Sequence, residues 1–112
     1  MHRRGDVVLV PIDFTDRTGS KWRPAVVVSV DEYQLLSPDV VIASVTSNLR
    51  AIPHPGDHQI VNWRSAGLLR PSLLQMKFAT VDASLVGRSL GRLSTADLDA
   101  LDRSLRRALD IG

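Results

Sequence analysis

The stretch that decides the fold lies in the first third of the chain, where residues 23–30 read RPAVVVSV. Pro24 cannot donate to a β-ladder, but the small and β-branched apolar residues after it run on without alternation. That pattern is typical of a strand covered on both faces or lying between the walls of a barrel. We therefore predict a central, buried strand over residues 24–30.

Further strand-like segments lie on both sides of this one. Residues 5–12 are apolar and β-branched and end near Pro11, and residues 40–45 repeat the pattern after a turn-forming segment at 31–39. Shorter strands are expected at 58–62, 72–76 and 85–90. Six strands at a spacing of about ten residues are typical of a small barrel or sandwich. The polar residues 13–23 are expected to form a long, exposed connection.

The last twenty residues change to a helical period. Ser94 is a good N-cap, and Asp97 follows three positions later, which is a weak form of the capping box. An apolar stripe at helical spacing comes next, formed by Leu98, Leu101, Leu105, Ala108 and Leu109. We expect a C-terminal helix that packs this stripe on the barrel and ends before Gly112.

Length and composition limit the class of protein. The chain has 112 residues, 44% hydrophobic and 23% charged, which predicts one globular domain over residues 1–112. Cysteine is absent, so a disulfide scaffold and a thiolate metal site are excluded, and a reducing compartment is favoured. No apolar run approaches the roughly 18 residues that span a bilayer. The expectation is a soluble, cytoplasmic protein without a membrane partner.

Basic charge is concentrated in the middle of the chain. The net charge is +2, but 12 of the 14 basic residues are arginine, and residues 50–92 alone carry +4. The planar guanidinium suits phosphate, so this segment is compatible with nucleic acid. Ordinary surface charge is the simpler explanation, and charge alone does not predict a nucleic-acid partner.

The histidines give no clear metal or proton-relay motif. His54 and His58 flank the sequence Pro55-Gly56-Asp57, which in principle can hold a metal or relay protons. Because Pro-Gly already explains the segment as a turn, we interpret both histidines as structural and predict neither a metal nor a cofactor.

Polar residues at strand ends are the remaining candidates. Arg23 stands just before one predicted strand, and Thr46, Ser47 and Asn48 follow another. Spacing alone allows two interpretations, turn and capping chemistry or a site displayed at the end of a barrel.

The order of short motifs favours the second of these interpretations. The blocks are 5–10 (GDVVLV), 14–21 (FTDRTGSK), 23–29 (RPAVVVS), 42–48 (IASVTSN), 67–72 (GLLRPS), 79–82 (ATVD) and 90–94 (LGRLS). In order and spacing they resemble the MazF/PemK family of toxin endoribonucleases of type II toxin-antitoxin systems. The resemblance covers nearly the whole chain.

This resemblance implies a mainly β, SH3-like small barrel of the MazF/CcdB kind with a C-terminal helix. It also implies a homodimer, a cognate antitoxin that inhibits the toxin, and metal-independent cleavage of single-stranded RNA, often mRNA. The family's arginine before proline falls on Arg23, and its threonine at the end of the third long strand falls on Thr46. Both are expected to be catalytic, as donors to the charge that grows on the phosphoryl oxygens when the neighbouring 2′-hydroxyl attacks.

The same resemblance suggests which residues contact RNA. The residues expected to do so are Phe14, Thr15, Lys21, Trp22, Ser47, Asn48, Gln75 and Lys77. Phe14 and Trp22 can stack on bases, or they can instead pin their loop to the core. Some family members carry Arg-x-Asp where this chain reads Gln75-Met76-Lys77, and neither Gln75 nor Lys77 replaces a carboxylate base. The general base stays unassigned.

Two rival functions remain open at this point. One is a toxin of the same fold that, like CcdB, poisons DNA gyrase without cleaving RNA, and such a protein does not require Arg23 and Thr46. The other is a catalytically silent barrel that only binds RNA or antitoxin, which Gln75 and Lys77 would favour.

Overall fold

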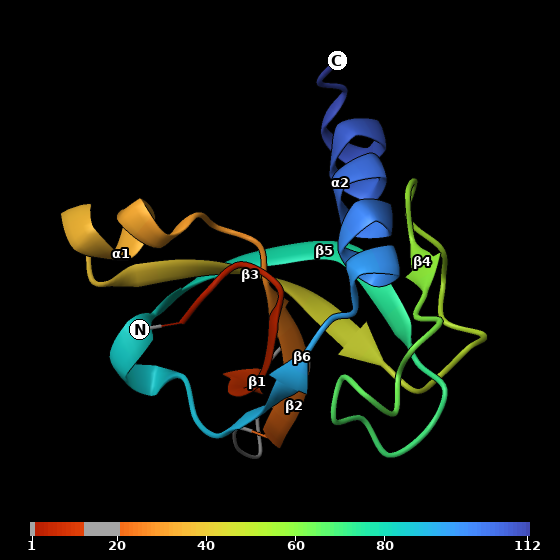
Figure 1. Cartoon of the computed structure of the whole chain (residues 1–112), viewed down its shortest axis with the longest axis horizontal. Helices are drawn as coiled ribbons and strands as arrows, with labels where there is room; N and C mark the ends of the chain where they lie inside the picture. Colours follow the sequence, from red (N-terminus) through yellow and green to blue (C-terminus); the bar gives the residue numbers. More distant parts are fainter. Residues whose placement is uncertain (1, 13–20) are drawn as a thin grey trace.

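Short β-strands form most of the protein (Figure 1). The computed structural model describes residues 2–12 and 21–112. The elements follow in the order β1 (Asp6–Ile12), β2 (Lys21–Val27), α1 (Asp31–Leu36), β3 (Asp39–Thr46), β4 (His58–Gln59), β5 (Leu73–Asp82), the 3₁₀ helix η1 (Ala83–Leu85), β6 (Ser89–Arg92) and α2 (Thr95–Leu109). The predicted mainly β chain with a C-terminal helix is confirmed.

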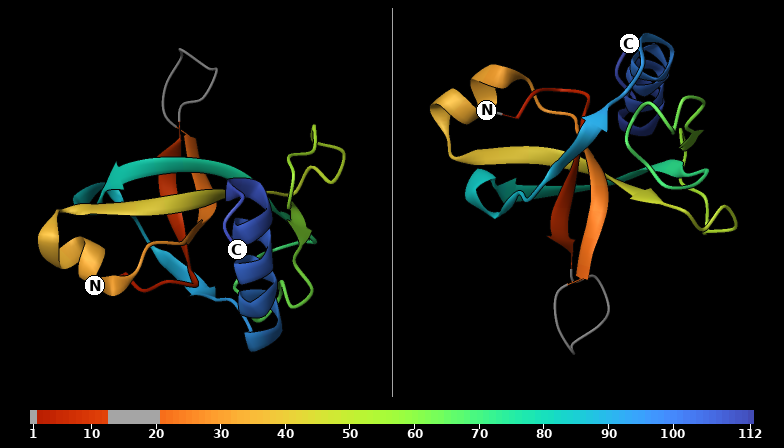
Figure 2. Two further views of the ribbon diagram at one scale, coloured as in Figure 1. Left: turned by 90° about the horizontal axis from the view of Figure 1, so that it is seen from above. Right: turned by 60° about the horizontal axis from the view of Figure 1, so that its bottom comes forward.

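The strands form one antiparallel sheet that curls into a half-barrel (Figure 2). Its order is β4-β5-β3-β2-β1-β6, so β2 and β3 lie in the middle, as the apolar run after Pro24 predicted. Strand β1 continues through Pro11, which pairs with Trp22 of β2. The pairing of β1 with β6 on its other side has already stopped before Pro11. Its missing N–H therefore leaves no gap in a ladder.

The central strands bury both of their faces. On one face Val7, Val26 and Ala43 belong to a core cluster that includes Leu101 of α2. On the other face, inside the curl, a second cluster is formed by Val8, Val10, Ala25, Val27, Val40 and Ile42. Burial on both sides explains why these strands have no polar alternation.

Helix α2 begins as predicted, and the oxygen of its N-cap Ser94 accepts a hydrogen bond from the Asp97 N–H at 3.3 Å. Leu101 is fully buried, and Leu98, Leu105 and Ala108 pack against the same core. The predicted stripe is wrong at Leu109, which is 52% exposed. The last turn of the helix extends beyond the sheet (Figure 1).

The segment 31–39, predicted as a turn, contains helix α1. Residues 31–36 hold neither Gly nor Pro, so one helical turn forms there and the Ser37-Pro38 turn signal marks only its end. The helix has no buried residue, and it lies at one end of the β3–β5 strand pair while α2 lies near the other (Figures 1 and 2).

Strand bounds differ from the predictions where pairing rather than composition decides them. β2 already begins at Lys21, because residues 21–23 pair with β1, so only 13–20 of the predicted connection is left, outside the described residues. β5 runs on to Asp82 along β3. β4 stops at Gln59, since the next backbone N–H groups turn to other partners. β6 starts only at Ser89, after η1.

None of the helices in the described part of the chain is long and apolar enough to cross a membrane.

Candidate functional site

A pocket of about 450 Å³ lies where several strands end. Its floor is apolar and is made by Leu9, Pro24, Val45, Leu68 and Leu90. The polar residues that line it are Arg23, Thr46, Ser47, Arg70, Ser72 and Arg88. A volume of this size, an apolar floor and a few convergent polar groups are the usual features of a binding site.

The strand register brings the two predicted catalytic residues together. The pairing between β2 and β3 reaches as far as Ala25 and Ser44. Arg23 lies in β2 two residues before Ala25, and Thr46 ends β3 two residues after Ser44, so both lie beyond this pair in the same direction. Both line the pocket, as expected of a site at a barrel end.

Thr46 also has the turn role that the sequence left open. Its Oγ1 accepts a hydrogen bond from the Asn48 N–H at 3.1 Å, and Asn48 Oδ1 in turn accepts one from the Arg50 N–H at 3.1 Å. A hydroxyl oxygen that accepts in this way keeps its own proton for donation. The turn therefore fixes the Thr46 oxygen and leaves its O–H to serve the pocket.

Arg70 and Arg88 were missed as candidate residues. Arg70 comes from the segment between β4 and β5, and Arg88 directly precedes β6. Among the described residues that line the pocket, three are arginines and none is a carboxylate. The concentration of basic charge in residues 50–92 was the sequence signal for these two arginines. Only the fold shows which arginines of that segment line the same pocket as Arg23.

Two glycines hold the Arg70 segment directly against β6. Gly67 has φ +84°, and a Cβ placed on it would come within 2.0 Å of the Leu90 carbonyl oxygen. A Cβ on Gly91 would meet the Ala66 oxygen at 2.6 Å. Backbone touches backbone here, so this side of the pocket has little room to move.

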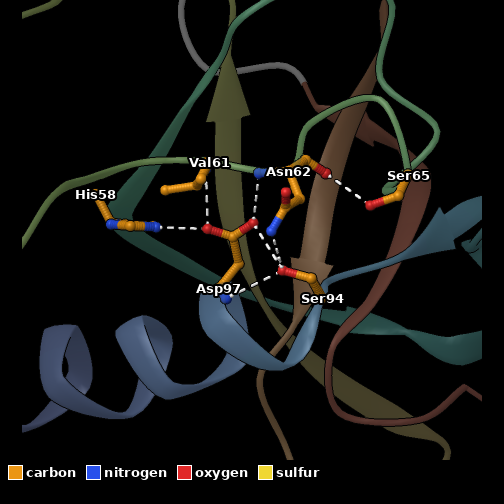
Figure 3. Close-up of polar contacts among 6 residues, drawn as sticks. All are labelled: His58, Val61, Asn62, Ser65, Ser94 and Asp97. Atoms are coloured by element: carbon orange, nitrogen blue, oxygen red, sulfur yellow. Dashed lines mark hydrogen bonds and ion pairs between the residues drawn. The ribbon is translucent and has the colours of Figure 1, made fainter.

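A buried carboxylate anchors the beginning of the same segment (Figure 3). Asp97 is fully buried, and its two oxygens accept hydrogen bonds from the N–H groups of Val61 and Asn62, each at 2.9 Å. His58 Nε2 lies 2.8 Å from Asp97 Oδ1, and the Ser94 hydroxyl lies 3.2 Å from Oδ2. Asp97 thus ties residues 58–62 to the start of α2, where the sequence suggested only a cap.

The electrostatics of Asp97 follow from this geometry. Burial alone raises the pKa of a carboxyl group, but the hydrogen bonds from His58, Val61, Asn62 and Ser94 outweigh it and hold the pKa of Asp97 below its ordinary value. The carboxylate form is therefore the one that the fold requires.

The other histidine of the predicted turn is structural as well. His54 and Asp57 close a turn in which Gly56 has φ +89°, and Asp57 accepts from the N–H groups of His54 and Met76 at 2.8 and 2.7 Å. Within the described residues, no group of three or more His, Asp or Glu side chains is arranged to hold a metal ion.

The predicted RNA contacts divide into three groups. Ser47 lines the pocket and Asn48 follows it in the chain. Trp22 is 57% exposed, and its ring lies close to Gly87, which precedes Arg88: a Cβ added at Gly87 would come within 2.7 Å of it. Lys21 is exposed at the start of β2. Gln75 is buried in β5, Lys77 is half-buried there, and neither lines the pocket. Phe14 and Thr15 lie outside the described residues.

Comparison with known proteins identifies the family. Residues 3–109 match the model of the PemK-like, MazF-like toxins of type II toxin-antitoxin systems. No curated protein sequence matches the chain.

Solved structures show the same fold at low sequence identity. An endoribonuclease in complex with its cognate antitoxin from a mycobacterial species is 20% identical, with a TM-score of 0.79 over 100% of this chain and 98% of that one. The Mycobacterium tuberculosis toxin MazF-mt6 is 21% identical, with a TM-score of 0.72 over 96% and 98%. MazF in the MazE-MazF structure from Deinococcus radiodurans is 20% identical, with a TM-score of 0.74 over 98% and 97%. By the family match along nearly its whole length, the chain belongs to the PemK-like, MazF-like toxins of type II toxin-antitoxin systems.

Proposed function

We propose that this toxin is an endoribonuclease that cleaves single-stranded RNA, mRNA among it, at a short sequence. The observation that carries the proposal is that Arg23 of β2 and Thr46 at the end of β3 line one pocket. Solved structures of the same fold are described as endoribonucleases, which agrees with this assignment.

The reaction is an intramolecular transesterification of the RNA, in which one proton is removed and one is returned. The 2′-hydroxyl oxygen attacks the adjacent phosphorus and loses its proton, and the bond from phosphorus to the 5′-oxygen breaks. That oxygen gains a proton, so the products are a 2′,3′-cyclic phosphate and a 5′-hydroxyl. Negative charge grows on the two non-bridging oxygens in between, and stabilising this charge is the task of the site.

Arg23 and Thr46 match that task. A guanidinium donates two parallel hydrogen bonds to phosphate oxygens, and the Thr46 hydroxyl, held by its turn, supplies a further donor. The guanidinium provides the positive charge that a metal ion would otherwise bring, so we propose that cleavage proceeds without one. The apolar floor under the arginines suits a nucleobase next to the phosphate.

The family match also supports a protein partner. We propose that a cognate antitoxin inhibits the toxin in the cytoplasm, as an antitoxin is bound in the mycobacterial and Deinococcus structures. We also propose a homodimer. Large exposed apolar side chains are typical of interaction surfaces, and this protomer has several, among them Leu36 at 86% and Leu69 at 91%.

The decisive test is incubation of the purified protein with a long single-stranded RNA in EDTA. We expect cuts at a recurring short sequence, with cyclic phosphate and 5′-hydroxyl ends. If the RNA stays intact in EDTA and also in added Mg²⁺, the endoribonuclease assignment is wrong. A DNA gyrase supercoiling assay then tests the gyrase-poison alternative.

Trp22 provides a separate prediction on RNA binding. Its indole is more than half exposed and lies beside the pocket wall at Gly87 and Arg88. Base stacking on an aromatic side chain contributes about 1–3 kcal/mol. We therefore expect Trp22→Ala to weaken the binding of single-stranded RNA by about tenfold or more, with little change in melting temperature. A large loss of thermal stability with unchanged RNA affinity would instead show that Trp22 stabilises the packing of β2.

A further inference from the structure

Two arginines of the pocket remain once Arg23 and Thr46 are assigned to the scissile phosphate. Arg70 and Arg88 come from different segments of the chain and line the same pocket, and both are exposed. Three arginines therefore line one pocket, and none of the described residues that line it is a carboxylate.

Two of the described arginines outside the pocket each form an ion pair, and the others do not. Arg92 pairs with Asp6 at 2.9 Å, and Arg4 pairs with Asp102. Among the described residues, by contrast, no ion pair involves any of the three arginines of the pocket. Gathering like charges without a partner opposes folding, so the arrangement indicates a site whose counter-charge comes from a ligand.

The number of charges indicates more than one phosphate. A phosphodiester carries one negative charge and two non-bridging oxygens, which a bidentate arginine and a hydroxyl already satisfy. Arg70 and Arg88 then lack an anion unless neighbouring phosphates of the same strand reach them.

The wall that carries both arginines is also rigid. The Arg70 segment touches β6 through Gly67 and Gly91, and the Arg88 carbonyl accepts a hydrogen bond from the Leu9 N–H at 2.9 Å. Their backbones are thus held relative to each other before any ligand binds, which lowers the entropy lost on binding.

We propose that Arg70 and Arg88 bind the phosphates that flank the scissile one, so that the pocket recognises three consecutive phosphates of a single RNA strand. This inference rests on the proposed function. Both residues are binding residues, because a flanking phosphate carries the same charge before and during cleavage. Their contribution therefore belongs to substrate affinity, whereas that of Arg23 belongs to the chemical step.

The test measures RNA binding as a function of salt. The probe is an oligonucleotide spanning a mapped cut site, with a 2′-deoxy nucleotide at the cut so that it binds without being cleaved. Arg70→Gln and Arg88→Gln are compared with the parent and with Arg103→Gln, which removes the same charge from an exposed position of α2 outside the pocket. Thermal melting confirms that each variant is folded.

Each lost phosphate contact is expected to reduce the slope of log K against log salt by about 0.7. Arg70→Gln and Arg88→Gln should both show this change and raise KM for a cleavable RNA, with kcat within about threefold of the parent. Arg103→Gln should leave the slope unchanged.

Three results would overturn the inference. Unchanged slopes in both pocket variants, in a parent that does cleave RNA, refute it and leave the proposed function standing. A fall in kcat without a change in slope would place these arginines at the scissile group instead. A parent that neither binds nor cleaves single-stranded RNA would refute the inference and the proposed function together.

Discussion

Replacing Arg23 with alanine is expected to slow RNA cleavage by about 10²–10³-fold, the usual cost of removing one donor to a developing oxyanion. Arg23 lines the pocket and is exposed, so its removal should not disturb the core. The loss should appear mainly in kcat, because the charge that Arg23 meets is greatest in the transition state. Single-turnover cleavage of a short RNA containing one mapped site measures it directly.

Two further variants separate the geometry of Arg23 from its charge. Arg23→Lys keeps the charge but loses the planar fork, so we expect it to recover only a small part of the lost rate. Arg103→Gln, on the outer surface of α2, serves as the control for net charge and should cleave like the parent. If Arg23→Ala cleaves as fast as the parent while melting normally, the catalytic role of Arg23 is refuted.

Thr46 offers an independent check on the same site. Thr46→Val removes the hydroxyl that donates into the pocket and also the oxygen that accepts from the Asn48 N–H, whereas Thr46→Ser keeps both. We expect the valine variant to lose rate to a similar extent as Arg23→Ala and the serine variant to retain most of it. A valine variant that keeps its rate while the serine variant loses it would show that the methyl group, and thus packing, is what matters.

Most of the fold was predictable because its signals are local. The unbroken apolar run after Pro24 indicated a strand buried on both faces, and the Ser94 cap with Leu98, Leu101 and Leu105 indicated the helix. What failed depended on contacts made at a distance. Lys21 joins β2 because Ile12 pairs with it, and Leu109 stays exposed because the sheet does not reach that far.

The site was predictable only in part, for the same physical reason. Arg23 and Thr46 stand next to strand ends and were found through the resemblance of their motifs. Arg70 lies in a segment without regular structure, and its neighbours in the sequence do not indicate that it lines the same pocket as Arg88. In the sequence Asp97 was interpreted only as part of a weak capping box, so its second role was missed. Its partners Val61 and Asn62 are backbone donors, which leave no mark on the sequence.

Asp97→Asn is expected to destabilise the protein by about 2–4 kcal/mol, although the two side chains have nearly the same shape. The carboxylate accepts from two backbone N–H groups, from Ser94 and at His58, and it is fully buried. In asparagine an NH₂ donor replaces one of the two acceptor oxygens. At least one buried backbone N–H then faces another donor, and each such unsatisfied group costs about 1–3 kcal/mol. The midpoint and slope of urea unfolding measure the change. Asp99→Asn, on the exposed side of the same helical turn, should differ from the parent by only a few tenths of a kcal/mol.

The acid limb of stability provides the sharper test of the same carboxylate. The pKa of Asp97 is lower in the folded protein than in the unfolded chain, so the unfolded chain takes up this proton first as the pH falls. Its contribution to stability is therefore complete above the ordinary carboxyl pKa and is lost as the pH drops through it toward the lowered value. Asp97→Asn has no such proton to bind, so its stability should fall less steeply than that of the parent below about pH 4, while Asp99→Asn should follow the parent. Parallel acid limbs in all three proteins would mean that the hydrogen bonds at His58, Val61 and Asn62 do not favour the charged form, and that the anchoring of residues 58–62 to the start of α2 has another origin.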